Sequence, residues 1–339
     1  MQIFLNILFL IIGMALLIEG ANFFVKGASA VASRLNVPSI FIGLTVVAVG
    51  TSLPELSVSI TSAISNNIDM SVGNVVGANM LNLLFTLGII ALTSSVTIHK
   101  SSKRIDFPFL LAITTAITLF SLDVILDGAN KNILSRIESI VLLLLLILYM
   151  SILIFNANRN RKREKKQELY YQQLNIFEQD TKENIKPLKV WQIVVYLVLG
   201  LGAVVFGGDC VTTTAEFLAL KMGMSEALVG LTIVSFGTTL PEMVTSVIAA
   251  KKGENDLALG NIVGSNIINM SLILSTVGLI AQAPISSIIL TDLIILLIST
   301  VVFTIICYRK QKIGKIEGLI FVLMYIAYLT FAIVRNYAF

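Results

Sequence analysis

The sequence GLTVVAVGTSLPELSVSI occupies residues 43–60, and a related sequence, GLTIVSFGTTLPEMVTSV, occupies residues 230–247. With an offset of 187, the two stretches are identical at ten of eighteen positions. The same offset aligns GNVVGANMLNLLFTLG of residues 73–88 with GNIVGSNIINMSLILS of residues 260–275, without a gap. We therefore interpret the chain as an internal duplication with one motif at 43–88 and a second at 230–275.

The composition around these motifs is that of a membrane protein. Of 339 residues, 56% are hydrophobic and only 13% are charged, about half the charged fraction of soluble domains. This excludes a soluble globular enzyme, and the long apolar blocks disfavour a β-barrel. Ten segments have the length of a transmembrane helix: about 3–25, 39–64, 71–95, 107–124, 137–155, 190–208, 226–249, 257–280, 288–308 and 317–335. The predicted fold is an all-α polytopic membrane protein with ten transmembrane helices.

The basic residues predict the orientation. If the N-terminus is outside, the cytoplasmic loops contain 20 of the 24 Lys and Arg residues. We therefore predict both termini outside, in a multi-pass protein of the cell membrane. The net charge of +4 is explained by this loop bias and does not indicate nucleic-acid binding.

The duplication divides the predicted spans into two sets of five. Residues 1–155 form the first repeat, 156–189 a basic cytoplasmic linker, and 190–339 the second repeat. Because five is odd, the second repeat must cross the membrane in the opposite direction. Inverted repeats of this kind place a substrate site near the midplane, where broken helices of both halves meet, which favours transport.

Each motif carries one acidic residue inside its span. Glu55 is the only charged residue between 39 and 65, and Glu242 the only one between 227 and 250. A charge at this depth is costly and is a functional candidate by default. Pro54 and Pro241 precede the two glutamates, so both helices should kink or unwind there. A kink beside a protonated carboxyl is the plainer interpretation of one copy, but the symmetric second copy disfavours it.

The neighbouring side chains add only oxygen-containing groups. These are Thr51, Ser52, Thr238, Thr239, Ser265, Asn82 and Asn269. Two carboxylates with neutral oxygens, without sulfur or imidazole, suit hard cations such as Ca²⁺ and Na⁺. The motif glycines are interpreted as helix-packing positions. Whether Asn74 and Asn261 are ligands or structural hydrogen-bonding residues stays open.

The motifs GTSLPE and GTTLPE, each followed by GNxxGxNxxN, resemble the α-repeats of the sodium/calcium exchangers in the calcium/cation antiporter superfamily. The resemblance covers both halves and implies four ion sites between helices two, three, seven and eight. It implies that Glu55 and Glu242 bind Ca²⁺ and that Ser52 and Thr239 line sodium sites. It further implies coordinating carbonyls at Thr51, Thr238, Ala48 and Ser235, and contributions from Asn82, Asn269 and Ser265.

Two departures from the family pattern, at Ala78 and Asn269, refine this expectation. Ala78 stands where Ser265 stands in the second half, so one hydroxyl ligand is missing. Asn269 occupies a position where some relatives carry aspartate, and the relatives that co-transport potassium resemble that aspartate version. We therefore expect transport by this chain to be independent of K⁺. Neither copy has the GNxxE pattern of the proton-coupled exchangers, and the short linker leaves no room for a large regulatory domain.

The favoured function is an electrogenic antiporter that exchanges Na⁺ for Ca²⁺ by alternating access. A H⁺-coupled Ca²⁺/cation antiporter is the alternative. A channel usually obtains a carboxylate ring from oligomeric symmetry, whereas this chain supplies its own pair and is compatible with a monomer. The chain has no HExxH motif and no catalytic nucleophile–histidine set, so an enzyme is not expected. We expect Ca²⁺, Na⁺ and membrane lipid as partners, and no cofactor and no nucleic acid.

Overall fold

The computed structural model describes residues 2–126, 128, 130–173, 188–222 and 235–338. The first half contains α1 (Gln2–Leu35), α2 (Ser39–Ile42), the π-helical turn η1 (Gly43–Val47), α3 (Ala48–Thr51), α4 (Leu53–Ile64), α5 (Ile68–Met80), the π-helical turn η2 (Leu81–Thr86), α6 (Leu87–Thr93), α7 (Lys100–Arg104), α8 (Asp106–Phe120), α9 (Asp123–Leu126) and α10 (Arg136–Gln173). The second half contains α11 (Val190–Lys221), α13 (Ser235–Thr238), α14 (Leu240–Lys251), α15 (Asn255–Ile268), the π-helical turn η4 (Asn269–Ile273), α16 (Leu274–Ala281), α17 (Ser287–Arg309) and α18 (Lys315–Ala338).

The membrane-spanning character is confirmed, whereas the count of ten spans stays a prediction. Within the described residues, seven helices are long and apolar enough to cross a membrane, or eight if the pair bent at Ser52 is one span. The predicted fourth span corresponds to α8, which has only 15 residues. Residues 226–234 of the predicted seventh span lie outside the described residues.

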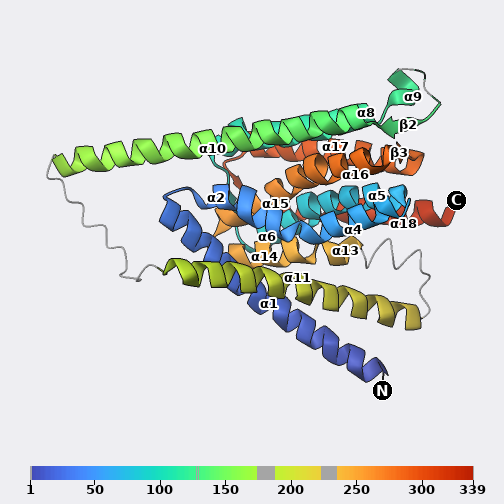
Figure 1. The fold of residues 1–339 in the computed structure, drawn as a ribbon, viewed down its shortest axis with the longest axis horizontal. Helices are drawn as coiled ribbons and strands as arrows, with labels where there is room; N and C mark the ends of the chain where they lie inside the picture. The colour runs from blue at the N-terminus through green and yellow to red at the C-terminus, as the bar shows by residue number, and fades with distance from the viewer. Residues whose placement is uncertain (1, 127, 129, 174–187, 223–234, 339) are drawn as a thin grey trace.

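The two ends of the bundle are distinct in Figure 1. α1 begins and α18 ends at the same end, while α10 extends from the opposite end. α10 continues to Gln173 and so enters the predicted linker, of which 174–187 are outside the described residues. The side of the membrane on which the termini lie stays a prediction.

Two continuous helices form the centre of the bundle. In α5–α6 and in α15–α16, 78% and 83% of the most apolar window is buried, against 17% in α10 and in α18. The peripheral helices therefore present apolar side chains outward, as lipid contact requires. Figure 1 shows α10 on one side of this centre and α1 with α11 on the other.

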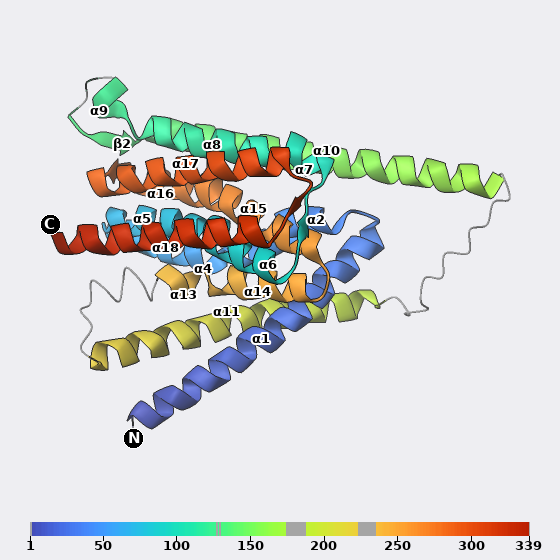
Figure 2. The ribbon, with the colours of Figure 1, turned by 180° about the vertical axis from the view of Figure 1, so that it is seen from behind.

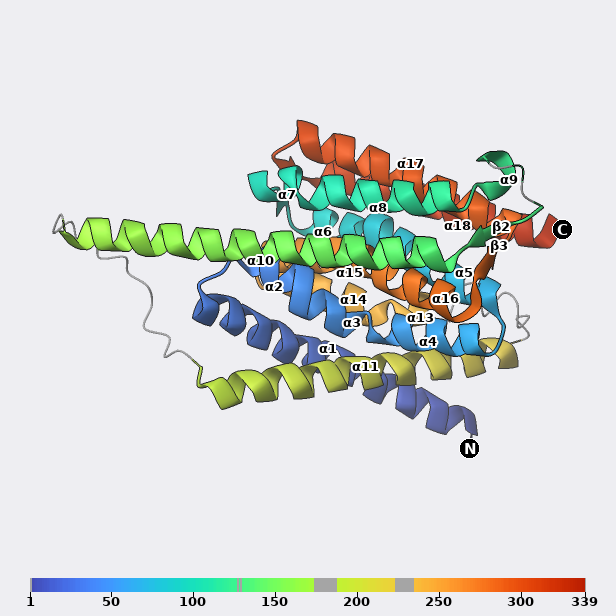
Figure 3. The ribbon, with the colours of Figure 1, turned by 45° about the horizontal axis from the view of Figure 1, so that its top comes forward.

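α1 and α11 cross each other in opposite directions (Figure 3). Small residues allow their backbones to approach closely. A Cβ atom added at Gly200 would lie 2.5 Å from the Phe24 nitrogen, so glycine is required at this crossing.

Lys252, in the turn after α14, donates to the Asn22 carbonyl of α1 at 2.9 Å. Burial, followed by the charge of Lys26, lowers the pKa of Lys252.

Two short antiparallel strand pairs join the halves. β1 (Val96–Thr97) pairs with β4 (Lys312–Ile313), and β2 (Asn132–Leu134) pairs with β3 (Ala283–Ile285). Figure 2 shows β2 beside α9, at the end of the bundle opposite to α7. The described chain is mostly helical, as the all-α prediction requires, and these four short strands are an addition that the sequence did not predict. Strands of two or three residues carry no readable alternation, and they form because loops of different halves meet.

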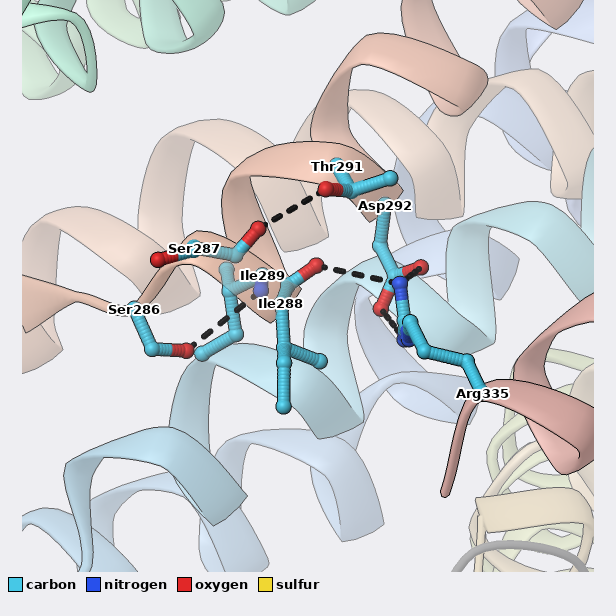
Figure 4. Close-up of polar contacts among 7 residues, drawn as sticks. All are labelled: Ser286, Ser287, Ile288, Ile289, Thr291, Asp292 and Arg335. Atoms are coloured by element: carbon cyan, nitrogen blue, oxygen red, sulfur yellow. Dashed lines mark hydrogen bonds and ion pairs between the residues drawn. The ribbon is translucent and has the colours of Figure 1, made fainter. Parts of the chain in front are cut away.

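A bidentate ion pair joins α17 to α18 (Figure 4). Arg335 Nη1 and Nη2 each donate to one carboxylate oxygen of Asp292 at 3.0 Å. The Arg335 side chain is 13% and the Asp292 side chain 15% exposed, so the pair is largely removed from solvent. The guanidinium also lies 5.2 Å from the centre of the Phe331 ring. The two parallel hydrogen bonds fix the orientation of α18 relative to α17.

Candidate functional site

Both motif helices are interrupted beside a proline, as predicted. Ser52 separates α3 from α4, and Thr239 separates α13 from α14, with a proline in the first turn that follows. Proline has no N–H group to donate to the carbonyl four residues earlier, which weakens the helix at that point. In the first half the two segments meet at an angle of 44°.

Glu55 and Glu242 lie in the first turns of the second segments, and their carboxylates face each other. Both are fully buried. The Glu55 carboxylate faces Thr239 and Glu242, and the Glu242 carboxylate faces Ser52. Within the described chain none of the four carboxylate oxygens has a hydrogen bond of normal length and angle. Two adjacent buried carboxylates without such bonds need positive charge from a cation or a proton.

Other predicted ligands add buried oxygens on elements that contact the glutamate helices, because η4 packs against α4 and η2 packs against α14. Within the described residues, Ser52 Oγ, Asn82 Oδ1, Ser265 Oγ and Asn269 Oδ1 also have no hydrogen-bond partner. In native proteins the large majority of buried polar atoms are hydrogen-bonded, so this concentration indicates a ligand-binding region. Among the described residues, no three His, Cys, Asp or Glu side chains lie close enough together to hold a metal ion. The site therefore offers two carboxylates and neutral oxygens, a donor set for hard cations.

The predicted threonines are held by their hydroxyl groups. Thr51 Oγ1 lies 3.1 Å from both the Val47 carbonyl and Asn261 Oδ1. Thr238 Oγ1 donates to Asn74 Oδ1 at 3.1 Å. Because both hydroxyl groups are engaged in these hydrogen bonds, the coordinating role predicted for Thr51 and Thr238 is assigned to their backbone carbonyls.

The other two predicted carbonyls lie on the same helical segments. The carbonyl of Ala48 accepts the Ser52 amide at 3.1 Å, so its second lone pair is the one left for an ion. Ser235 begins α13, and its side chain is outside the described structure.

The central helices α5 and α15 contact each other through asparagines. Asn79 Nδ2 donates to the Asn266 carbonyl at 3.3 Å, and Asn266 Nδ2 donates to the Asn79 carbonyl at 3.4 Å. Asn269 Nδ2 donates to Asn79 Oδ1 at 3.2 Å, which leaves Asn269 Oδ1 as the free end of that amide. Asn82 and Asn269 both lie in π-helical turns, which are frequent at functional sites.

Several buried polar residues of this region were not in the predicted set. Asn74, Asn79, Asn261 and Asn266 hydrogen-bond across the halves, as described above. The sequence signal for them was the recurrence of each asparagine at the offset of 187. Thr86 and Thr245 also have buried hydroxyls without a partner in the described chain, but neither recurs in the other half.

Comparison with known proteins adds an independent finding. The family model described as sodium/calcium exchanger protein matches residues 5–155 and 192–334. The chain is 32% identical to the sodium/calcium exchanger MaX1 of Methanosarcina acetivorans, over 97% of this chain and 98% of that protein. It is 31% identical to the inner membrane protein YrbG of Escherichia coli, over 89% and 88% of the respective chains.

A solved structure has the same fold. The sodium-calcium exchanger NCX_Mj, soaked with 2.5 mM Na⁺ and 0.1 mM Ca²⁺, superposes with a TM-score of 0.80 at 27% identity. The match covers 96% of this chain and 98% of that chain. The arrangement of helices around the two motifs is therefore shared along almost the whole length.

Proposed function

We propose that this chain, which belongs to the sodium/calcium exchanger protein family, exchanges Na⁺ for Ca²⁺ by alternating access at the site between Glu55 and Glu242. Membership of the family makes it a multi-pass transporter of the cell membrane and a cation antiporter for Ca²⁺, not an enzyme. The family transports Ca²⁺ and Na⁺ without a cofactor. The coupling ion and the ligand residues are the proposed part.

The observation that carries the proposal is the facing pair of buried carboxylates. Two carboxylates balance the charge of one Ca²⁺, which removes the cost of leaving Glu55 and Glu242 ionised inside the protein. Because no cationic side chain contacts either group in the described structure, this charge must come from a transported ion or a proton.

Sodium is the coupling ion that fits the neutral oxygens. A proton carrier requires only the carboxyl groups, whereas Na⁺ requires several oxygen ligands at once. Ser52 faces the Glu242 carboxylate, and Ser265 and Asn269 each present a buried oxygen without a hydrogen-bond partner in the described structure. A stoichiometry of three Na⁺ for one Ca²⁺, as the family resemblance implies, would move net charge and make transport sensitive to voltage.

The two halves supply the moving parts of the proposed cycle. The site lies where both broken helices and both central helices meet, so rocking one set of helices against another would expose it to either side. We place the inverted repeats at 1–155 and 190–339, with the stretch 156–189 as the linker.

Calcium uptake into sealed proteoliposomes tests the proposal. Vesicles are preloaded with Na⁺, with K⁺, or with an acidic interior, and ⁴⁵Ca²⁺ uptake is measured. Uptake driven by the sodium gradient and enhanced by an inside-positive potential supports electrogenic exchange. Uptake driven by the proton gradient alone would assign the function to the H⁺-coupled alternative, with the two glutamates as proton carriers.

Matched variants connect the activity to the site. Glu55→Gln and Glu242→Gln keep the shape of the side chain and remove its charge. Glu19→Gln makes the same change in α1, outside the site, and serves as the control. Calcium flux without any counter-ion would indicate a channel and contradict antiport at this site.

A further inference from the structure

Two buried asparagines outside the proposed ligand set make equivalent contacts in the two halves. Asn261 Oδ1 lies 3.1 Å from Thr51 Oγ1, and Asn74 Oδ1 lies 3.1 Å from Thr238 Oγ1. An amide oxygen has no hydrogen, so the threonine is the donor in both pairs. The threonines differ by 187 in number, and so do the asparagines. Each bond therefore joins one half of the duplication to the other.

The other end of each amide group is also held. Asn74 Nδ2 donates to Ser59 Oγ at 3.2 Å, and Asn261 Nδ2 donates to Ser246 Oγ at 2.8 Å. These serines are again equivalent residues of the duplication. Because hydroxyl groups can donate or accept, the serine and threonine contacts hold both ends of each amide. The orientation of the Asn261 amide is fixed by the Glu242 carbonyl, which can only accept from Nδ2.

The contacts connect the break in one half with the glutamate helix of the other half. Thr51 is the last residue of α3, immediately before the break. Ser246 follows Glu242 by four residues on α14, which places both on the same face of that helix. Asn261 also donates to the Glu242 carbonyl at 3.3 Å. Asn261 thus spans from the first break to the second glutamate.

The equivalent bridge runs in the other direction. Thr238 is the last residue of α13, before the second break, and Ser59 follows Glu55 by four residues on α4. Asn74 connects them. Both asparagines are at most 6% exposed, so neither bond competes with bulk water.

We propose that Asn74 and Asn261 are positioning residues that hold each broken segment against the glutamate helix of the opposite half and thereby set the affinity for the transported cation. The inference rests on the proposed function, because it concerns the geometry of that site. It makes a specific claim about partners: Thr51 acts with Asn261, and Thr238 acts with Asn74.

Double-mutant cycles test these partners. Thr51→Val removes the hydroxyl but keeps the backbone carbonyl, and Asn261→Leu removes the amide at similar size. Thr51→Val is expected to raise the KM for Ca²⁺ by roughly tenfold, the cost of losing a buried hydrogen bond. Asn261→Leu also removes the bonds to Ser246 and the Glu242 carbonyl, so its effect should be at least as large. The double variant should be no worse than the more impaired single variant. Combining Thr51→Val with Asn74→Leu should instead multiply the two effects.

The control is a buried threonine elsewhere. Thr114 of α8 donates to the Leu110 carbonyl of its own helix at 2.8 Å, and Thr114→Val is expected to leave the KM for Ca²⁺ unchanged. If a leucine variant does not fold, Asn261→Ser and Asn74→Ser replace it in the same cycle. Multiplied effects in both combinations would overturn the proposal. A lowered melting temperature with an unchanged KM would also overturn it, because that result indicates packing alone.

A second readout separates this inference from the proposed function. The rise in melting temperature on adding Ca²⁺ to the protein in detergent reports binding without transport, and the same cycle is repeated on it. If the wild-type protein shows no sodium-driven uptake, the proposed function fails. The pairing of Thr51 with Asn261 is then tested by the double-mutant cycle measured on Ca²⁺ binding. Coupling between the two substitutions supports the pairing, and additive effects would contradict it.

Discussion

The two halves carry nearly the same motif, but the polar side chains of the first half have fewer partners. Neither amide atom of Asn82 is hydrogen-bonded within the described chain, whereas the equivalent Asn269 donates to Asn79 at 3.2 Å. Ala78 has no hydroxyl where Ser265 has one. The duplication thus supplies equivalent helices, and one substitution together with one difference in hydrogen bonding makes the oxygen sets of the two halves unequal.

The two ends of the bundle differ in a related way. Asp256 and Asp69 are equivalent residues in the first turns of α15 and α5. His99 Nε2 lies 2.8 Å from the Asp256 carboxylate, a side-chain contact between the halves. At the other end, Asp69 and Ser286, which is equivalent to His99, line a cavity of about 530 Å³. Equivalent residues therefore differ in their surroundings: His99 contacts Asp256 at one end, whereas Ser286 lines a cavity at the other.

The largest expected effect tests whether the two glutamates are equivalent. Glu55→Gln and Glu242→Gln should each reduce ⁴⁵Ca²⁺ uptake by more than about 100-fold, because one carboxylate cannot balance a divalent ion in a buried site. Elution from a size-exclusion column should be unchanged. Robust uptake by either variant would contradict the site assignment.

A second pair of changes tests the unequal asparagines. Asn269→Asp would place a carboxylate oxygen against Asn79 Oδ1, an acceptor against an acceptor, whereas Asn82→Asp breaks no hydrogen bond of the described structure. We expect Asn269→Asp to lower the free energy of unfolding by about 2 kcal/mol more than Asn82→Asp. Thermal unfolding in detergent without Ca²⁺ measures it. Equal melting temperatures would show that the Asn79 bond does not orient Asn269.

A third pair of changes exchanges the missing hydroxyl between the halves. Ser265→Ala should raise the Na⁺ concentration for half-maximal exchange by about threefold, because one neutral oxygen ligand is lost. Ala78→Ser should lower it. Sodium titration of uptake measures both, with Ca²⁺ held constant. Unchanged sodium dependence in both variants would remove position 265 from the sodium sites.

The smallest effect is expected at the contact between His99 and Asp256. The side chain of His99 is 45% exposed, and exposed pairs contribute about 0–1 kcal/mol. His99→Ser, which installs the residue of the equivalent position, should therefore change the uptake rate less than about twofold. A larger loss would show that the contact with Asp256 controls the transport cycle.

Much of the candidate site could be predicted from residue types and spacing. Glu55 and Glu242 were the isolated charges in apolar spans, and Pro54 and Pro241 marked the breaks that the structure contains. These features are local, because burial of one charge or loss of one N–H group has its consequence within a turn of helix.

Other features could not be predicted because they depend on packing between distant segments. The role of Asn261 follows from its contacts with Thr51 and Ser246, which lie on different helices. The same holds for β1 and β4, which are more than 200 residues apart in sequence. The loops that contain these two strands carry no sequence pattern that identifies the segment with which each will pair.

The sequence by itself determined that this chain crosses a membrane many times, that it is duplicated, and that each copy carries a carboxylate beside a broken helix. Hydropathy, repetition and the missing N–H of proline are properties of the chain that need no partner. Only the tertiary structure decided which amide faces which hydroxyl, and that Glu55 and Glu242 share one buried space. A hydrogen bond tolerates a deviation of only a few tenths of an ångström in its donor–acceptor distance. The required distances are reached only after the two halves have packed together.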